Sequence, residues 1–185
     1  MNLDLFHSNT IKLAEYYKKL GERTFSQLSE EDIHWTPGES SNSISAIVKH
    51  LWGNMLSRWT NFLTEDGEKP WRQRDAEFED DILNLNEMLS KWTEGWDCFL
   101  GALKSLQSED FDKTVFIRNE GHQVIDAIQR QMAHYPMHIG QIIYIAKLLK
   151  GEDWTSLSIP KGQSSEYNQE KFSQEKKNQH FSDNA

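Results

Sequence analysis

The 185-residue sequence lacks several features that mark large classes of protein. It has a single cysteine, Cys98, so no internal disulfide can form and stability requires no oxidising compartment. Nowhere do about 18 apolar residues run together, the length that a membrane-spanning helix needs. The first residues also lack the basic and apolar regions of a secretory signal peptide. We therefore expect a soluble, cytoplasmic protein.

Basic residues are fewer than acidic residues. Lysine and arginine number 20 against 29 aspartates and glutamates, which gives a formal net charge of -9. Long-range electrostatics therefore disfavour a nucleic-acid backbone or an anionic membrane as a partner. The sequence also contains no G-x-S-x-G, P-loop or G-x-G-x-x-G motif. Cys98 falls beside the apolar face of a predicted helix, where a buried, inert thiol is expected.

Aromatic residues and helical periodicity are abundant. Seven tryptophans and nine phenylalanines indicate a folded core, and the length suits one domain. Apolar residues alternate at spacings of three and four over about seven turns, which predicts one long amphipathic helix. Its apolar stripe consists of Ile82, Leu85, Leu89, Trp92, Trp96, Phe99, Leu103 and Leu106.

Three further helices complete an all-α prediction. The first carries Phe6, Leu13, Tyr17 and Leu20; the second spans about residues 43–63; the last spans about residues 124–149 and ends at Gly151. A β-prone segment at 114–117, with a possible turn at 119–121, precedes the last helix. We predict a four-helix bundle over residues 1–168 and a polar, mobile tail over residues 169–185.

Two histidines stand four positions apart in the stretch "QMAHYPMHIGQI". At about 100° per residue, His134 and His138 share one line of the last helix, bracketed by apolar residues. Their Cβ atoms would lie about 5–6 Å apart, so both rings could reach one ion. Pro136 between them removes a backbone donor and is expected to bend or loosen the helix.

His50, on the second helix, is a third candidate ligand. It lies on a polar but uncharged stripe beside an apolar arc, a pattern typical of a cavity wall, with Ser43, Asn54, Ser57 and Asn61. Asn54, one turn after His50, would be placed to hydrogen-bond a ligand or a bound water. The alternative is that the histidines are only packed or hydrated. The remaining histidines share no common face: His7, His34, His122 and His180.

Two known metal patterns are excluded. A zinc protease H-E-x-x-H motif needs a glutamate where Tyr135 stands. A di-iron bundle needs glutamates, yet the second helix has no acidic residue and the last has only Asp126. A neutral three-histidine site remains. The charged run at 66–81, which contains Arg72 and Arg74, is interpreted as a solvated connection, with a substrate or subunit contact as the alternative.

Long blocks of the sequence resemble a known superfamily. The blocks that carry the resemblance are "HLWGNMLSRWTNFLTEDGEKPWRQRDAEFE", "AIQRQMAHYPMHIGQIIYIAKLL" and "WTSLSIPKGQS". Through these blocks, residues 3–168 resemble the DinB-like four-helix bundle proteins, in a bacterial branch of unknown function. The resemblance implies one divalent ion (Zn, Ni, Fe or Mn) held by His50, His134 and His138. Relatives in that superfamily include mycothiol-dependent isomerases and bacillithiol or glutathione S-transferases, and dimers are frequent.

A three-histidine ion keeps its full positive charge and an open coordination position, which is typical of catalytic sites. Such an ion lowers the pKa of bound water to about 7 and deprotonates a bound thiol. We therefore expect a metal-dependent transferase or hydrolase acting on a small molecule, with a low-molecular-weight thiol as a candidate cofactor. The alternative is a non-catalytic, stress-associated metal-binding or interaction module. The abundance of Trp, Phe and Leu also predicts a homodimer.

Overall fold

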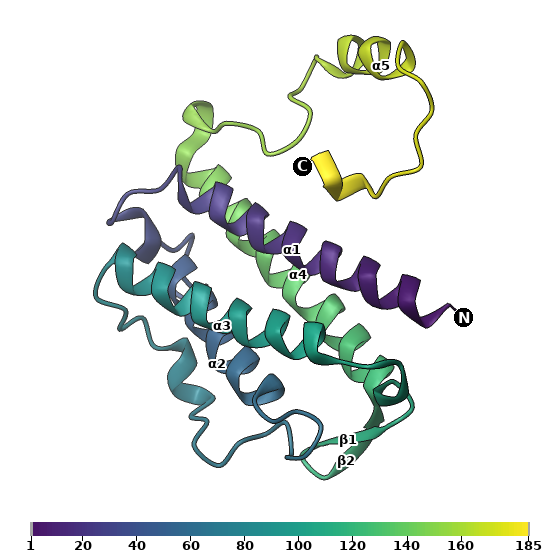
Figure 1. The fold of residues 1–185 in the computed structure, drawn as a ribbon. Coiled ribbons are helices and arrows are strands. Elements are labelled where there is room, and N and C mark those ends of the chain that lie inside the picture. The colour runs from purple at the N-terminus through teal and green to yellow at the C-terminus, as the bar shows by residue number, and fades with distance from the viewer. Residues whose placement is uncertain (1, 185) are drawn as a thin grey trace.

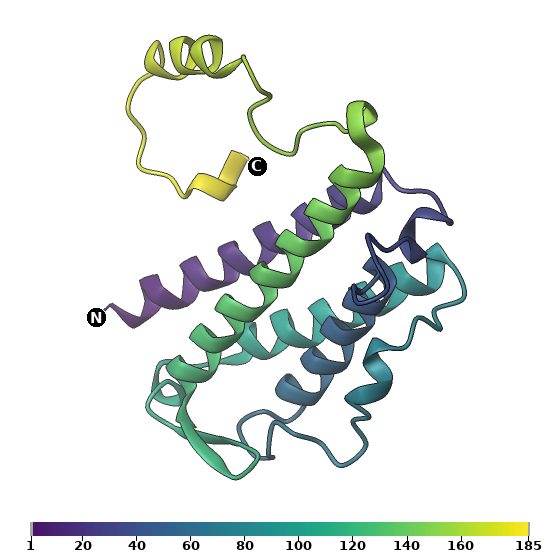
Figure 2. The same ribbon diagram turned by 180° about the vertical axis from the view of Figure 1, so that it is seen from behind.

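A computed structural model describes residues 2–184, which are mostly helical with one small two-stranded sheet (Figure 1). The four long helices are α1 (Leu3–Phe25), α2 (Ile44–Trp59), α3 (Leu85–Ser105) and α4 (Val124–Lys150). Helices α1 and α2 each pack against both α3 and α4, as Figure 2 shows from behind. The four predicted helices are therefore present and share one core.

Side-chain caps define where three of these helices begin. Asn2, Ser43 and Asn84 each accept a hydrogen bond from a backbone N–H in the first turn of α1, α2 and α3, which satisfies one of the free donors at a helix start. Helix α4 ends at Lys150 and is capped, as predicted, by Gly151, where φ is +55°. Glycine adopts this value without the steric cost that a Cβ would impose.

The core is built around the aromatic stripe of α3. Trp92, Trp96 and Phe99 are all buried, as predicted, whereas Ile82 and Leu106 of the predicted stripe are buried just outside the helix. Phe25 of α1 meets Trp92 edge-on, with ring centroids 4.9 Å apart. A Cβ at Gly21 would collide with the Trp92 indole, so glycine there permits the close packing of α1 on α3.

A β-hairpin leads directly into α4. Strands β1 (Thr114–Ile117) and β2 (Glu120–Gln123) pair antiparallel, as the β-prone segment indicated. The turn lies at Arg118 and Asn119, which both have positive φ, and not at 119–121 as predicted. Asp66 accepts both of their backbone N–H groups at 2.8 Å, which fixes the turn beside the loop that follows α2.

Helix α2 is shorter than predicted. Asn61 adopts a φ of +49°, and the helix ends at Trp59, so Asn61 does not continue the stripe that contains His50. The chain then crosses to α3 through a loop that contains a 3-10 turn, η2 (Asp75–Phe78). This loop folds back onto α2, and its position decides the composition of the site described below.

Beyond Pro160 the chain forms a short helix, α5 (Ser164–Phe172), that sequence reasoning missed. None of its residues is buried, so hydrophobic periodicity gave no signal for it. A final 3-10 turn touches α1, where Lys12 and Asp183 form an exposed ion pair at 2.8 Å. The mobility of residues 169–185 stays a prediction. Within the described residues, no helix combines the length and hydropathy needed to span a bilayer.

Candidate metal centre

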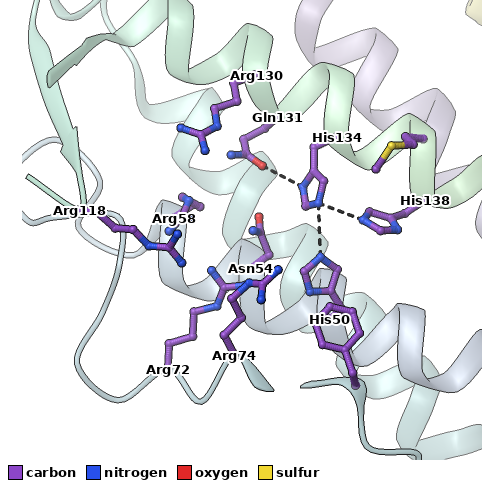
Figure 3. A pocket seen from close by; sticks show the side chains of 12 residues that line it. His50, Asn54, Arg58, Arg72, Arg74, Arg118, Arg130, Gln131, His134 and His138 are labelled. Atoms are coloured by element: carbon purple, nitrogen blue, oxygen red, sulfur yellow. Dashed lines mark hydrogen bonds between the residues drawn. The ribbon is translucent and has the colours of Figure 1, made fainter. Parts of the chain in front are cut away.

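Three imidazole rings converge between α2 and α4 (Figure 3). The Nε2 atom of His134 lies 3.3 Å from Nε2 of His50 and 3.0 Å from Nε2 of His138. His134 and His138 are one turn apart on α4, which runs through Pro136 without a break, and His50 faces them from α2. The structure thus brings together the three histidines that the sequence singled out.

Each of these rings also has an acceptor for its outer nitrogen, Nδ1. The distance from Nδ1 is 2.9 Å to Glu77 Oε2 for His50, 3.3 Å to Gln131 Oε1 for His134, and 2.8 Å to Gln141 Oε1 for His138. An oxygen acceptor at Nδ1 selects the tautomer that carries its proton there. The three Nε2 lone pairs consequently point toward one another.

The donor set fits a divalent cation. Three neutral lone pairs with no proton between them repel, whereas a cation placed among them would satisfy all three. Nitrogen ligands about 2.0–2.1 Å from a tetrahedral zinc ion lie roughly 3.3 Å apart. Two of the observed Nε2 separations, 3.3 Å and 3.0 Å, are close to that spacing, and all three rings have donor atoms within 4.8 Å of one another.

Burial keeps the rings on α4 uncharged. Desolvation, followed by the charges of His138 and His50, lowers the pKa of His134 to about 3. Burial also lowers the pKa of His138, against the opposing effect of its hydrogen bond to Gln141. Metal binding requires neutral imidazole, so these rings are in the required protonation state at neutral pH.

Glu77 is a functional residue that sequence reasoning missed. It is only 5% exposed, and it accepts hydrogen bonds of 2.7 Å and 2.9 Å from Arg72 in addition to the one from His50. Burial raises the pKa of this carboxyl, but the bonds from Arg72 and His50 bring it below the usual value. Gly53 makes room for Glu77, because a Cβ there would collide with the carboxylate.

The interpretation of residues 66–81 as a solvated connection is wrong for its central part. The Arg72 side chain is 2% exposed, and Glu77 is buried with it. The cause is η2, which packs onto α2 and stacks Phe78 on the His50 ring with centroids 4.8 Å apart. The only sequence signal of this anchoring was the presence of two aromatic residues, Trp71 and Phe78, within a charged run.

A cavity of about 400 Å³ adjoins the histidines. Besides the three rings it is lined by two amides, two apolar side chains and five arginines: Asn54, Gln131, Phe78, Met137, Arg58, Arg72, Arg74, Arg118 and Arg130. Phe78 of η2 and Met137 of α4 are the apolar part of a lining that is otherwise polar. A pocket of this size holds a small molecule.

Asn54 lies in this cavity wall, but it makes no hydrogen bond to a histidine among the described residues. Its Oδ1 accepts the Tyr135 hydroxyl at 3.1 Å, and that hydroxyl accepts Trp59 Nε1 at 2.9 Å. Two other members of the predicted stripe form hydrogen bonds with backbone groups instead. Ser43 caps α2, and the Ser57 hydroxyl donates to the Gly67 carbonyl.

The other candidate groups lie elsewhere. His7 bonds to the Leu103 carbonyl oxygen and His34 pairs with Asp80. Neither these nor the two remaining histidines, His122 and His180, line the cavity. Cys98 is half-buried on α3, where burial raises the pKa of its thiol, in agreement with an unreactive role.

Comparison with known protein families gives a match over most of the chain. A family model described as "Protein of unknown function (DUF1572)" matches residues 4–163, a range that includes every residue of the histidine cluster and its cavity. No curated protein and no solved structure matches the chain.

Proposed function

The chain belongs to the DUF1572 family, and from this and the geometry above we propose that it is a divalent-metal-dependent enzyme acting on a small molecule. His50, His134 and His138 would hold the ion. The observation that carries the proposal is the convergence of three Nε2 lone pairs whose rings are each fixed from behind by an oxygen acceptor.

We further propose that the fold is a four-helix bundle of the DinB-like type. Helices α1 to α4 pack around one core, and the histidines come from the second and fourth of them, which is the arrangement that the sequence resemblance implies. The hairpin and the loop containing η2 are then additions that close one end of the cavity.

The cavity favours a reactive site over a sealed structural one. Structural metal sites are closed by four protein ligands, whereas three ligands beside open space leave a position for water or substrate. A bound divalent ion would supply the charge that makes water or a thiol nucleophilic at neutral pH. Glu77, Gln131 and Gln141 would hold the three imidazoles in the required orientation.

The chain itself offers little else that is reactive. Among the described residues that line the cavity there is no carboxylate, cysteine, lysine or tyrosine. The nucleophile is therefore a water or a second substrate. Transfer of a low-molecular-weight thiol such as bacillithiol or glutathione is the version of the proposal that we favour, because the thiol would then come from outside the chain.

Metal analysis of the protein, purified without a histidine tag, tests the metal site. We expect about one divalent ion per chain, loss of the ion in His134→Ala, and full retention in the matched control His34→Ala. Absence of metal from the wild type, or equal loss from both variants, would overturn the site.

Thiol transfer to a halogenated aromatic tests the reaction, with bacillithiol or glutathione as the donor. We expect transfer by the metal-loaded protein and none after chelation. Transfer that survives removal of the metal would contradict metal activation. If the metal-loaded protein uses neither thiol, thiol transfer is ruled out and hydrolysis becomes the favoured reaction.

A further inference from the structure

Arginine is concentrated in one place in this protein. The sequence has six arginines, and five of them line the cavity beside the histidines: Arg58, Arg72, Arg74, Arg118 and Arg130. None of the fourteen lysines, all within the described residues, lines it. The five arginines come from α2, the loop before η2, the hairpin turn and α4, so folding gathers them from separate segments (Figure 3).

The nearby carboxylates neutralise only part of this charge. Glu77 is occupied by Arg72, and Glu68 is shared among Arg58 at 3.0 Å, Arg72 at 3.3 Å and Arg118 at 3.3 Å. Two carboxylates therefore serve three guanidinium groups. In a chain with a net charge of -9, the cavity is a local region of positive charge.

Carboxylates neutralise the two remaining arginines very little. Arg130 is exposed and makes no ion pair or side-chain hydrogen bond within the described residues. Arg74 lies over the Phe78 ring, 5.5 Å from its centroid, and its one carboxylate partner is Asp75, 4.0 Å away and itself fully exposed. Figure 3 shows Arg130 on α4 across the cavity from Arg74. Both guanidinium groups are thus free to bind a ligand between them.

Two buried amides add further donors. Trp59 Nε1 can only donate, so the Tyr135 hydroxyl accepts from it and gives its own proton to Asn54 Oδ1. Gln131 Oε1 is occupied by Nδ1 of His134. Both amide oxygens therefore already accept a hydrogen bond, whereas the NH2 groups have no acceptor among the described residues. Asn54 and Gln131 are only 5% and 3% exposed, so these donors are largely buried.

We propose that this cavity binds a small molecule carrying a carboxylate, phosphate or sulfonate group. The oxyanion is held by Arg74 and Arg130, with the amide groups of Asn54 and Gln131 donating to it and the remaining arginines supplying background charge. Guanidinium matches the planar, two-oxygen edge of such groups better than ammonium does. The inference rests on the proposed function only in placing this group beside the metal; it names the substrate class.

Calorimetric titration of metal-free wild type with malonate, inorganic phosphate and methanesulfonate is the primary test, with uncharged malonamide as the control ligand. Metal-free protein is used so that the anion cannot bind through the ion. We expect saturable one-site binding of at least one oxyanion and none of malonamide. The three anions distinguish the preferred acidic group.

Substitutions of cavity residues test where the oxyanion binds. Arg74→Ala and Arg130→Ala should each weaken it by about tenfold, the effect of losing one charge-assisted hydrogen bond. Arg23→Ala removes the same charge from α1, outside the cavity, and should leave affinity within about twofold. Asn54→Asp keeps an oxygen for Tyr135 but replaces the NH2 donor with a carboxylate oxygen, and should abolish binding.

Metal content measured in parallel separates this inference from the proposed function. Oxyanion binding by a protein that takes up no metal would overturn the proposed function and leave the inference standing. Metal uptake without oxyanion binding would overturn the inference alone. Equal weakening by Arg23→Ala and Arg130→Ala, or malonamide binding as tight as malonate binding, would also overturn it.

Discussion

Glu77 Oε2 and His50 Nδ1 are joined by a hydrogen bond of 2.9 Å, although the two residues are 27 positions apart in the sequence. The same carboxylate receives two bonds from Arg72. Because Arg72 fixes Glu77 and Glu77 fixes the ring of His50, the orientation of one candidate ligand depends on the loop between α2 and α3.

Replacing Glu77 by Gln should weaken metal binding by about 10–100-fold, the usual effect of losing a partner behind a ligating histidine. The substitution removes the charge that Arg72 and His50 both contact. Competition with a chelator measures the affinity, at a temperature at which circular dichroism shows the variant to be folded. Glu79→Gln, an exposed neighbour, is the matched control, and an equal loss in both variants would contradict the assigned role.

Replacing Gly53 by Ala should destabilise the protein by about 1–3 kcal/mol, the typical cost of overpacking, and should weaken metal binding because the Glu77 carboxylate has to move. Gly101→Ala on α3 meets nothing within 4 Å and should stabilise by up to about 1 kcal/mol. Urea unfolding measures both changes. A neutral Gly53→Ala substitution would show that Glu77 does not need its observed position.

Acid should destabilise the metal-free protein through His134. Its folded-state pKa of about 3 lies below the ordinary value of 6.5, so between these values the unfolded chain binds more protons than the folded one. The stabilisation is complete above about pH 6.5 and is lost as the pH falls toward about 3. Urea midpoints measured across this range should fall less in His134→Gln than in wild type. His180→Gln, in the tail, should behave as wild type.

We also propose that the protein forms a homodimer. Met137, Tyr144 and Leu148 lie on one line of α4 and are 54%, 64% and 49% exposed, an arrangement that favours contact with a second apolar surface. Light scattering at about 100 μM, which would populate even a micromolar dimer, should give twice the chain mass. Leu148→Glu should reduce this to a monomer, whereas Phe172→Glu on α5 should not. A wild-type monomer would refute the proposal.

The sequence by itself determined the features that depend on neighbouring positions. The apolar stripe of α3 follows from helical periodicity, the end of α4 follows from Gly151, and the shared line of His134 and His138 follows from their spacing of four. These predictions succeed because one helical turn brings such residues together whatever the rest of the chain does.

Only the tertiary structure decided what surrounds the histidines. The hydrogen bond between Glu77 and His50 and the placement of Arg74 and Arg130 around one cavity both join segments that are remote in sequence. The turn at Arg118 and Asn119 likewise depends on Asp66, some fifty positions earlier. Arg72 and Glu77 would be solvated in an isolated segment, and they acquire their roles only where packing removes water and pairs the two opposite charges.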